Sequence, residues 1–291
     1  MKIVKYFFEF IVIIFLFCIF KIIGIKNASS LGSILGKVIG PFFRSKNIIK
    51  QNIKIGLGNL DKKKEEEIIN GMWSNIGRTF AEYIFLKNLK LSKTGFNHIK
   101  ITGIEYLDQI KKSNKPVVFF SGHFANFELM AMELDKFGIK LAAIYRPLNN
   151  FFLNPLMEHL RMKYICPIQI QKGVSGSREI VKKIKDKYSI ALMVDQRVSE
   201  GPRLSFFNKE AHTTTIPVQI ALKYNCKLVP IYIERKNGIN FEMVIHEPYE
   251  ITKTGVHEDD LKNNSLTINK NIEKMIIKNP TQWIWTHDRW K

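Results

Sequence analysis

The sequence predicts an α/β fold in which a mixed sheet is flanked by helices, with an N-terminal transmembrane helix in front of it. Three observations support this fold class. The first 25 residues are almost continuously apolar, short β-branched or aromatic runs alternate with amphipathic helical segments after Gly95, and an Asn-Gly pair at 237–238 separates two such runs. Strands that alternate with helices are typical of α/β proteins. Asn-Gly suits a tight hairpin, so the sheet should contain an antiparallel pair.

The N-terminal apolar run extends from Tyr6 to Phe20 and resumes after Lys21 as far as Ile25. A helix needs about 20 apolar residues to cross a bilayer, and Glu9 lies near one end of the run, where it can reach the lipid headgroups. The alternative is a cleaved signal peptide with its cleavage site at residues 28–30. An uncleaved anchor is favoured by the basic residues that follow, which should keep the next segment in the cytoplasm: Lys26, Lys37, Arg44, Lys46, Lys50 and Lys54.

Two helical segments are expected next. Leu31 to Phe43 mixes Gly with large apolar residues, which predicts an interfacial amphipathic helix, although burial in the core would explain the pattern equally well. A longer helix should begin after Asp61 and continue to about Leu89, with an apolar stripe that serves packing.

After Gly95 the pattern predicts strands and helices in alternation. The expected strands are 115–121, 139–145, 189–194, 227–234 and 240–246, and the expected helices are 126–137, 154–163, 177–187, 215–224 and 258–278. We therefore divide the chain into a membrane anchor at residues 1–26, a helical membrane-proximal region at 27–94 and an α/β catalytic core at 95–291.

The composition is basic, with 45 Lys and Arg against 26 Asp and Glu and a net charge of +19. This excess indicates an anionic partner such as a membrane surface or an acidic carrier protein, although a Lys-rich composition throughout the chain would also produce it. The basic residues are scattered, and no nucleic-acid partner is expected. The three cysteines form no CxxC pair, which argues against a disulfide framework or a Cys-rich zinc site.

The strongest chemical signal is a His-x4-Glu pair, His123 and Glu128. The buried-strand pattern 117–120 ends in Ser121-Gly122, Asn126 is a suitable helix cap, and Glu128 falls in the first turn of the next helix. Ligands of open α/β sheets bind at this end of the strands. His123 can remove a proton from a hydroxyl, and we expect the Glu128 carboxylate to fix the tautomer of the imidazole.

His-x4-Glu alone is a weak pattern, and a structural histidine is its ordinary explanation. Its position after a strand and behind a membrane anchor favours catalysis. Other chemistries fit less well, because residues 173–177 fail the nucleophile-elbow pattern and the sequence has no HExxH motif, P-loop or dinucleotide fingerprint. No metal or cofactor is expected.

Several sequence blocks resemble those of the bacterial lipid A late acyltransferases and occur in the same order as in that family. Its members are lauroyl and myristoyl transferases of Kdo-lipid A and share a superfamily with lysophospholipid acyltransferases. The resemblance covers most of the chain. Beyond the anchor it rests on residues 122–128, Tyr145 to Asn150, Lys172-Gly173, Asp195-Gln196-Arg197, Phe206 to Thr213, Asn279 to Trp285, and then His287, Arg289, Trp290 and Lys291.

This resemblance implies transfer of a fatty acyl chain from acyl carrier protein to the hydroxyl of a 3-hydroxyacyl chain on a lipid A precursor, in lipopolysaccharide biosynthesis. It also implies an inner-membrane protein with a single-pass anchor and its catalytic part on the cytoplasmic side, in contact with membrane lipid. Two positions depart from the family pattern: Asn208 replaces a Gly after the paired Phe residues, and Ile216 replaces a Gly before Pro217.

Polar residues at other strand ends are candidates for substrate binding. Arg146 follows the strand 139–145 and can bind a phosphate or carboxylate as a fork. Asp195 and Arg197 follow the strand 189–194 and could pair with each other, pair with Arg146 or orient the acceptor. We add Asn126, Lys172 and Lys209 to this set, while Trp283 and Trp285 are expected in the core or at an interface.

Two alternatives stay open at this point. One is an acyltransferase for another glycolipid, such as a phosphatidylinositol mannoside. The other is a basic membrane-surface protein without enzymatic activity, in which His123 and Glu128 occur by chance.

Overall fold

The N-terminal segment folds as one long helix. The computed structural model describes residues 2–91 and 98–291, and helix α1 runs from Lys2 to Ile39 with a kink at Gly24, whose φ of 78° lies in the left-handed region. Together with the 3₁₀ turn η1 (Gly40–Phe42), α1 is long and apolar enough to cross a membrane. The expected apolar helix at residues 6–25 is therefore confirmed by its length and composition.

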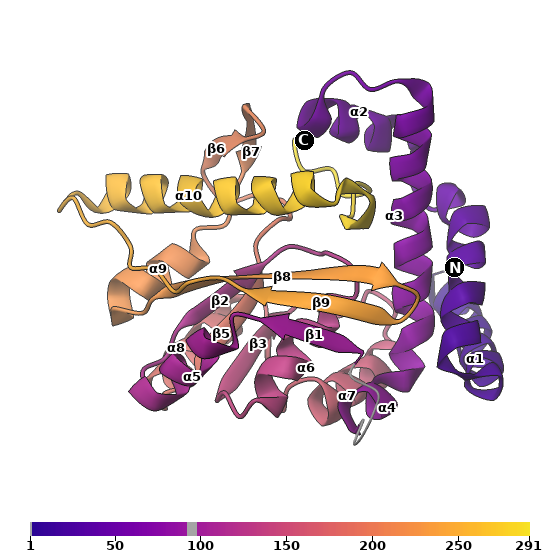
Figure 1. Cartoon of the computed structure of the whole chain (residues 1–291), viewed down its shortest axis with the longest axis horizontal. Helices are drawn as coiled ribbons and strands as arrows, with labels where there is room; N and C mark the ends of the chain where they lie inside the picture. Colours follow the sequence, from indigo (N-terminus) through magenta and orange to yellow (C-terminus); the bar gives the residue numbers. More distant parts are fainter. Residues whose placement is uncertain (1, 92–97) are drawn as a thin grey trace.

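Beyond the kink, α1 packs against α3 (Lys62–Glu82), as Figure 1 shows on the right of the molecule. The contact depends on glycines spaced four residues apart on α1. A Cβ atom at Gly32 or Gly36 would overlap the carbonyl oxygen of Gly77 or Trp73, so the two backbones approach too closely for any side chain between them. The opposite face of this segment carries exposed apolar side chains: Ile34, Val38, Ile39, Phe42 and Phe43. Burial against α3 is therefore confirmed for one side of the segment 31–43, and the interfacial position of its exposed apolar side stays a prediction.

The first half of α1 also contacts the α/β part of the molecule. The side-chain amide of Asn150 donates hydrogen bonds to the carbonyl oxygen of Tyr6 at 2.8 Å and to Glu9 Oε2 at 3.2 Å. The ring of Phe152 packs against Phe7, with centroids 5.5 Å apart. This contact joins the apolar helix to the segment that follows β3 (Leu141–Tyr145).

The helical region continues with α2 (Lys46–Leu57) and α3. The expected start of α3 is confirmed, because the Asp61 carboxylate accepts a hydrogen bond from the Lys64 backbone N–H at 2.8 Å and caps the helix. The helix then tightens into the 3₁₀ turn η2 (Tyr83–Phe85) and is followed by α4 (Leu86–Leu91). The expected boundary between residues 94 and 95 lies outside the described residues, and the division into three regions stays a prediction.

A seven-stranded mixed sheet forms the centre of the molecule, in the order β1-β9-β8-β2-β5-β3-β4. The predicted hairpin is confirmed, since β8 and β9 pair antiparallel around Gly238, whereas the other neighbouring strands pair in parallel. The remaining strands of the sheet are β1 (Ile99–Thr102), β2 (Val118–Ser121), β4 (Ile168–Gln171), β5 (Ser189–Met193), β8 (Leu228–Asn237) and β9 (Asn240–Ile245). Neither β1 nor β4 was among the predicted strands.

Helices connect these strands and cover the sheet, and all of them except α5 correspond to predicted helices. In Figure 1, α9 and α10 lie on one side of the sheet, and α5, α6 and α7 lie on the other. The helices are α5 (Ile104–Ser113), α6 (Glu128–Lys136), α7 (Asn154–Tyr164), α8 (Val174–Lys185), α9 (Ile216–Tyr224) and α10 (His257–Lys278), and the turn η3 (Pro280–Gln282) follows α10.

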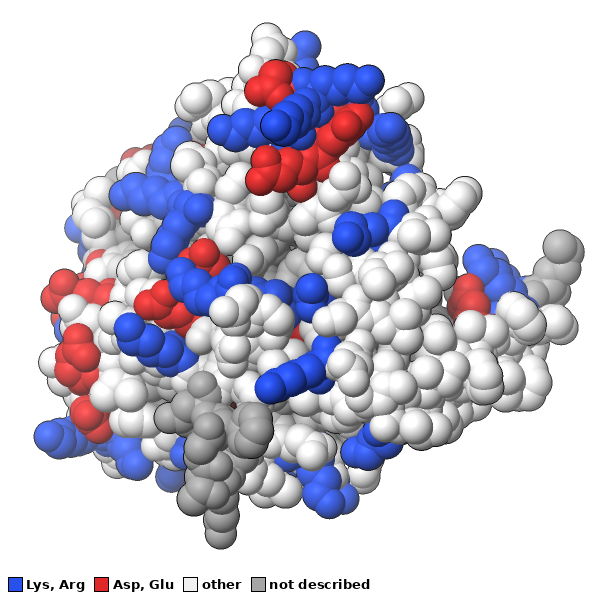
Figure 2. Space-filling view, turned by 45° about the vertical axis from the view of Figure 1, so that its right-hand side comes forward, with Lys and Arg blue, Asp and Glu red and all other residues white. Residues whose placement is uncertain are grey.

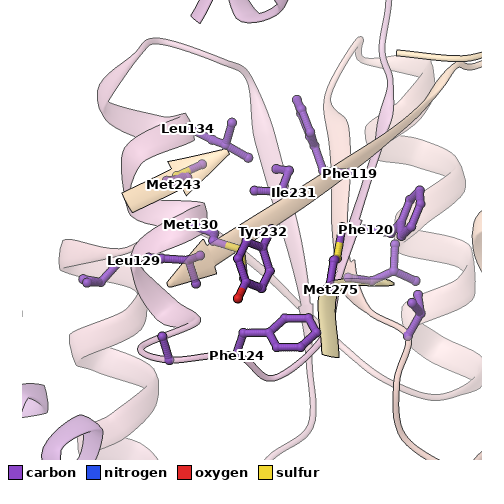
Figure 3. Close-up of a cluster of buried hydrophobic side chains, with 14 of the residues drawn as sticks. Phe119, Phe120, Phe124, Leu129, Met130, Leu134, Ile231, Tyr232, Met243 and Met275 are labelled. Atoms are coloured by element: carbon purple, nitrogen blue, oxygen red, sulfur yellow. The ribbon is translucent and has the colours of Figure 1, made fainter. Parts of the chain in front are cut away.

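A buried apolar cluster fixes the end of β2. Figure 3 shows Phe119 and Phe120 of β2 and Phe124 of the following loop among side chains of α6, β8, β9 and α10. Phe124 is fully buried and packs edge-on against Tyr232, with ring centroids 5.2 Å apart. Packing of Phe124 in the core therefore fixes the position of the loop after β2.

A separate hairpin, β6 (Arg203–Phe206) and β7 (Lys209–His212), explains one departure from the family pattern. Its two turn residues, Phe207 and Asn208, both have positive φ, 53° and 56°. Asn tolerates the left-handed region better than other non-glycine residues, so Asn208 can take the place of a glycine here.

The glycine contact between α1 and α3 makes a stability prediction. In Gly36→Leu, the new side chain has no space against Trp73 and Gly77, so the free energy of unfolding should fall by about 2–3 kcal/mol. Thermal unfolding of the full chain in detergent micelles measures this. Lys37→Leu places the same side chain one residue on, on the exposed face, and serves as the control. Equal melting temperatures for the two variants would show that the close contact contributes nothing.

Candidate active site

The loop after β2 presents His123 at the carboxyl edge of the sheet. Ser121 Oγ donates to the carbonyl oxygen of Ile231 on β8 at 2.6 Å, which fixes the start of the loop. Gly122 comes next, and a Cβ there would lie 2.7 Å from the Phe124 ring and 3.2 Å from Asp195 Oδ2. The loop can approach Asp195 this closely only because residue 122 has no side chain.

The imidazole of His123 is held by Asp195, which follows β5. His123 Nδ1 lies 2.7 Å from Asp195 Oδ1, and Asp195 Oδ2 accepts hydrogen bonds from the His123 backbone N–H and from Trp283 Nε1, each at 2.8 Å. The carboxylate is buried and takes three N–H groups, a satisfied arrangement for a charge in the protein interior. Trp283 is a core residue, as expected, and it also donates to the site.

The charges of this pair shift both pKa values. Burial alone would raise the pKa of Asp195, but the charge and hydrogen bonds of His123 and the Trp283 donor lower it to about 2. Burial alone would lower the pKa of His123, but the charge and hydrogen bond of Asp195 raise it above its ordinary value. Because ionised Asp195 can only accept, a neutral His123 carries its proton on Nδ1 and keeps a lone pair on Nε2.

The expectation that Glu128 holds His123 is wrong, since the hydrogen bond comes from Asp195. Glu128 Oε1 instead accepts from Arg161 Nε at 2.9 Å, Arg161 Nη2 at 2.5 Å and the Tyr83 hydroxyl at 3.1 Å. A guanidinium carries a full charge and several donors, so it attracts a carboxylate more strongly than a neutral imidazole does. Glu128 acts on His123 only through its charge, which contributes to the raised pKa of the imidazole.

Asn126 neither caps α6 nor lines the cavity described below. Its side chain is buried, and its amide donates to Glu82 Oε2 of α3 at 2.9 Å. Glu82 also binds Arg235 of β8 through both carboxylate oxygens, at 2.5 and 3.0 Å. Asn126 therefore ties the His123 loop to a buried ion pair.

The same buried network holds the loop backbone. Asn75 Nδ2 and Thr79 Oγ1 of α3 both donate to the carbonyl oxygen of Ala125 at 3.1 Å, and Arg235 Nε donates to Asn75 Oδ1 at 3.1 Å. Ala125 has a φ of 45°, an uncommon conformation for alanine, which these contacts maintain.

A cavity of about 470 Å³ opens beside His123. Its polar lining includes Glu128, Arg161 and His287, and its apolar lining comes from β2, α6, β3 and β5: Phe119, Phe120, Met130, Leu134, Ala143, Ile144, Ala191 and Leu192. The strand ends of β2, β3, β4 and β5 meet at this cavity because those strands are parallel neighbours.

Three of the predicted binding residues line this cavity with His123, namely Arg146, Lys172 and Arg197. Burial and the charge of Arg146 lower the pKa of Lys172. These three cations give part of the cavity lining a positive charge, and we call them its basic rim. Lys209 is exposed on β7 and is not among the cavity-lining residues.

Sequence reasoning missed the part played by Arg161, Tyr83 and His287. Nothing in the pattern of the helix 154–163 distinguishes Arg161, because its partner lies 33 residues earlier in the chain. His287 belongs to the closing block of the family resemblance and was given no role. Across residues 2–91 and 98–291, no group of three or more His, Cys, Asp or Glu side chains could hold a metal ion.

Comparison with known proteins gives one family. The family described as bacterial lipid A biosynthesis acyltransferase matches residues 1–291. The lipid A biosynthesis lauroyltransferase of Escherichia coli (strain K12) is 23% identical over 273 residues, which cover 90% of this chain and 84% of that protein. A lipid A biosynthesis acyltransferase of Haemophilus influenzae is 23% identical over 257 residues, 84% of this chain and 76% of that protein. Among solved structures, the 1-acyl-sn-glycerophosphate acyltransferase PlsC of Thermotoga maritima aligns over 86% of this chain and 95% of its own, with a TM-score of 0.39 and 14% identity.

The contact between His123 and Asp195 predicts a change in titration. Asp195→Asn removes the charge that raises the pKa of His123, so burial should then lower that pKa below its ordinary value of 6.5. NMR titration of the imidazole of the full chain in detergent micelles measures the shift. Asp186→Asn, on the exposed C-cap of α8, is the control. An unchanged pKa in Asp195→Asn would contradict the assigned pairing.

The ion pair between Glu128 and Arg161 predicts non-additive stability changes. Glu128→Leu and Arg161→Met each leave one charge nearly buried without its partner, so each should lower the free energy of unfolding by about 3 kcal/mol. The double variant should lose much less than the sum, because neither charge remains. Urea unfolding measures all three. Lys136→Met breaks the more exposed pair with Glu133 and should change stability by about 1 kcal/mol or less.

Proposed function

The chain belongs to the bacterial lipid A biosynthesis acyltransferases, and from this premise we propose that it transfers a fatty acyl chain from acyl carrier protein to the hydroxyl of a 3-hydroxyacyl chain on a lipid A precursor. One observation carries the proposal. His123, held by buried Asp195, lines a cavity that also has apolar walls and a basic rim. His123 suits a hydroxyl acceptor, the apolar walls suit a fatty acyl chain, and the basic rim suits an anionic substrate.

His123 acts as the general base in this proposal. Its Nε2 takes the proton of the acceptor hydroxyl as the hydroxyl oxygen attacks the thioester carbon, and it returns that proton to the departing thiolate. Asp195 stabilises the imidazolium formed between the two steps. Because the pKa of His123 is raised, the neutral base is lost as pH falls through that raised value, so the rate should decline toward acid pH.

Glu128 remains part of the proposed site, although its role differs from the expected one. It holds Arg161, and both residues line the cavity beside His123. Its negative charge also favours the imidazolium that forms during the reaction. We therefore assign Glu128 a positioning and electrostatic role.

The apolar wall of the cavity suits a fatty acyl chain. Phe119, Met130 and Leu134 present only apolar side-chain atoms, and each methylene that leaves water there gains about 0.8 kcal/mol. The basic rim formed by Arg146, Lys172 and Arg197 suits a phosphate group of the lipid A precursor. Lys209 lies outside the cavity and is proposed only as part of the basic surface that attracts the acidic carrier protein.

The apolar surface of α1 supports attachment to the inner membrane. In Figure 2 a broad uncharged surface occupies the right of the molecule, the side on which α1 lies in Figure 1, while Lys and Arg side chains are spread over the rest of that face. The exposed apolar residues of α1 include Phe7, Phe8, Ile11 and Phe15. We propose that α1 is a single-pass anchor and that the basic residues after its apolar run keep the catalytic part on the cytoplasmic side.

The direct test is acyl transfer by the purified full chain. Acyl carrier protein loaded with a fatty acid and a lipid A precursor should give an acylated lipid, and His123→Ala should lower the rate at least about 10²-fold because the base is removed. His159→Ala, on the exposed face of α7, should leave the rate unchanged. Full activity in His123→Ala would refute the mechanism.

The acceptor is tested separately by lipid analysis of a deletion strain. We expect one acyl chain fewer on lipid A, because the proposed product would not form. An unchanged number of acyl chains would contradict lipid A as the acceptor and would favour another glycolipid.

A further inference from the structure

A second histidine of the same cavity, His287, is fixed by contacts that the proposed mechanism does not use. Its carbonyl oxygen accepts from Asn52 Nδ2 of α2 at 2.8 Å and from the Arg289 backbone N–H at 2.8 Å. Arg289 is fully buried and donates to Thr213 Oγ1 at 3.0 Å. The carbonyl oxygen of His287 therefore has two hydrogen-bond donors, one of which belongs to a fully buried residue.

The ring of His287 is fixed as well. Its Nε2 accepts a hydrogen bond from the Arg197 backbone N–H at 2.8 Å. A backbone N–H can only donate, so Nε2 must carry the lone pair and the proton of the neutral ring must sit on Nδ1. Within the described residues, 2–91 and 98–291, Nδ1 has no hydrogen-bond acceptor, which leaves an oriented N–H donor on a ring that lines the cavity.

The two histidines of the cavity differ in charge state. Burial lowers the pKa of His287 to about 4, and the charge of Asp195, which acts in the opposite direction, does not restore it; Arg289 and His123 lower it further. The pKa of His123 is raised instead. Near neutral pH, His287 thus stays a neutral donor and does not compete with His123 for the proton of the acceptor. Such separation of two titratable groups is typical of sites that assign them different roles.

We propose that His287 Nδ1–H donates a hydrogen bond to the oxyanion of the tetrahedral intermediate in acyl transfer, an inference that rests on the function proposed above. When the acceptor oxygen bonds to the thioester carbon, the π electron pair of the carbonyl moves to its oxygen, and the hydroxyl proton moves to His123 Nε2. When the intermediate collapses, that electron pair re-forms the carbonyl, the carbon–sulfur bond breaks, and the thiolate takes the proton from His123. His287 keeps its own proton throughout and stabilises the charge on the oxygen.

Two substitutions separate this role from a purely structural one. His287→Gln can place an amide oxygen near the position of Nε2, where it accepts the Arg197 N–H, but it has no donor at the position of Nδ1. His287→Asn places an amide N–H near the position of Nδ1 but cannot reach the Arg197 N–H. The donor role therefore predicts that Asn preserves activity and Gln does not, and a structural role predicts the reverse.

The assay uses the full chain in detergent micelles with acyl carrier protein carrying a fatty acid, with and without the lipid A precursor. In His287→Gln, kcat and kcat/KM should fall together by about 10²–10³, with KM unchanged, because the lost interaction exists only in the transition state. His287→Asn should stay within about tenfold of the wild type in kcat, although its melting temperature should fall because the Arg197 contact is lost. Slow hydrolysis of the acyl donor in the absence of an acceptor should show the same order, since attack by water places a negative charge on the same thioester oxygen.

Each outcome decides the proposal. Normal kcat in His287→Gln, or equal losses in both variants, would overturn the donor role while the wild type and the His123→Ala control still support acyl transfer. If the wild type transfers no acyl chain but hydrolyses the donor, the acceptor is wrong and hydrolysis alone decides the role of His287. If the wild type does neither, the proposed function fails and the role of His287 fails with it.

Discussion

The buried ion pair between Arg235 and Glu82 joins the helical region to the sheet. Arg235 lies on the sheet, Glu82 lies at the end of α3, and both side chains are almost fully buried. Such a pair is tolerated in the interior only when its remaining hydrogen-bonding capacity is used. Here Ser29 of α1 and Asn126 of the His123 loop donate to Glu82, while Asn75 and the Phe241 ring contact Arg235. Helix α1, helix α3, the sheet and the His123 loop therefore meet at one pair of charges.

Asp195 is a second buried charge that binds several segments of the chain, and it lies at the candidate site. Its two oxygens hold the imidazole of His123, the backbone of the same loop and the indole of Trp283. Trp283 begins the segment that leads to His287, and His287 contacts the backbone of Arg197, two residues after Asp195. The ends of β2 and β5 and the C-terminal segment therefore constrain one another, so displacement of any one of them would move both histidines of the cavity.

Elements with a strong local pattern were predictable from the sequence. The apolar helix, the helix after Asp61, the strand before His123 and the hairpin at Asn237-Gly238 each carry their signal within a few neighbouring residues. Strands β1 and β4 are as short as β2 but lack its continuous apolar run, and they become strands through pairing with their neighbours.

The sequence predicted only those site residues that follow parallel strands, because such strands end at the same edge of the sheet. Arg146, Lys172 and Arg197 share the cavity because parallel strands end at one edge. The partner of His123 could not be chosen this way, because Glu128 was five residues away in sequence and Asp195 was 72. Arg161, on a different helix, binds the Glu128 carboxylate and keeps it from the His123 imidazole. Competition between Arg161 and His123 for this carboxylate depends on the folded structure and leaves no local pattern in the sequence.

The hydrogen bonds of Asn150 to α1 allow the apolar helix to support the segment that lines the cavity. The segment 146–149 forms one wall of the cavity, and Asn150, which follows it directly, is bonded to Tyr6 and Glu9. A shortened protein that begins after residue 26 would lose the acceptors of this amide and would uncover the rings of Phe151 and Phe152, which now pack against Tyr6, Phe7 and Phe10. A truncation chosen to remove the apolar helix would therefore also remove the support behind the cavity beside His123.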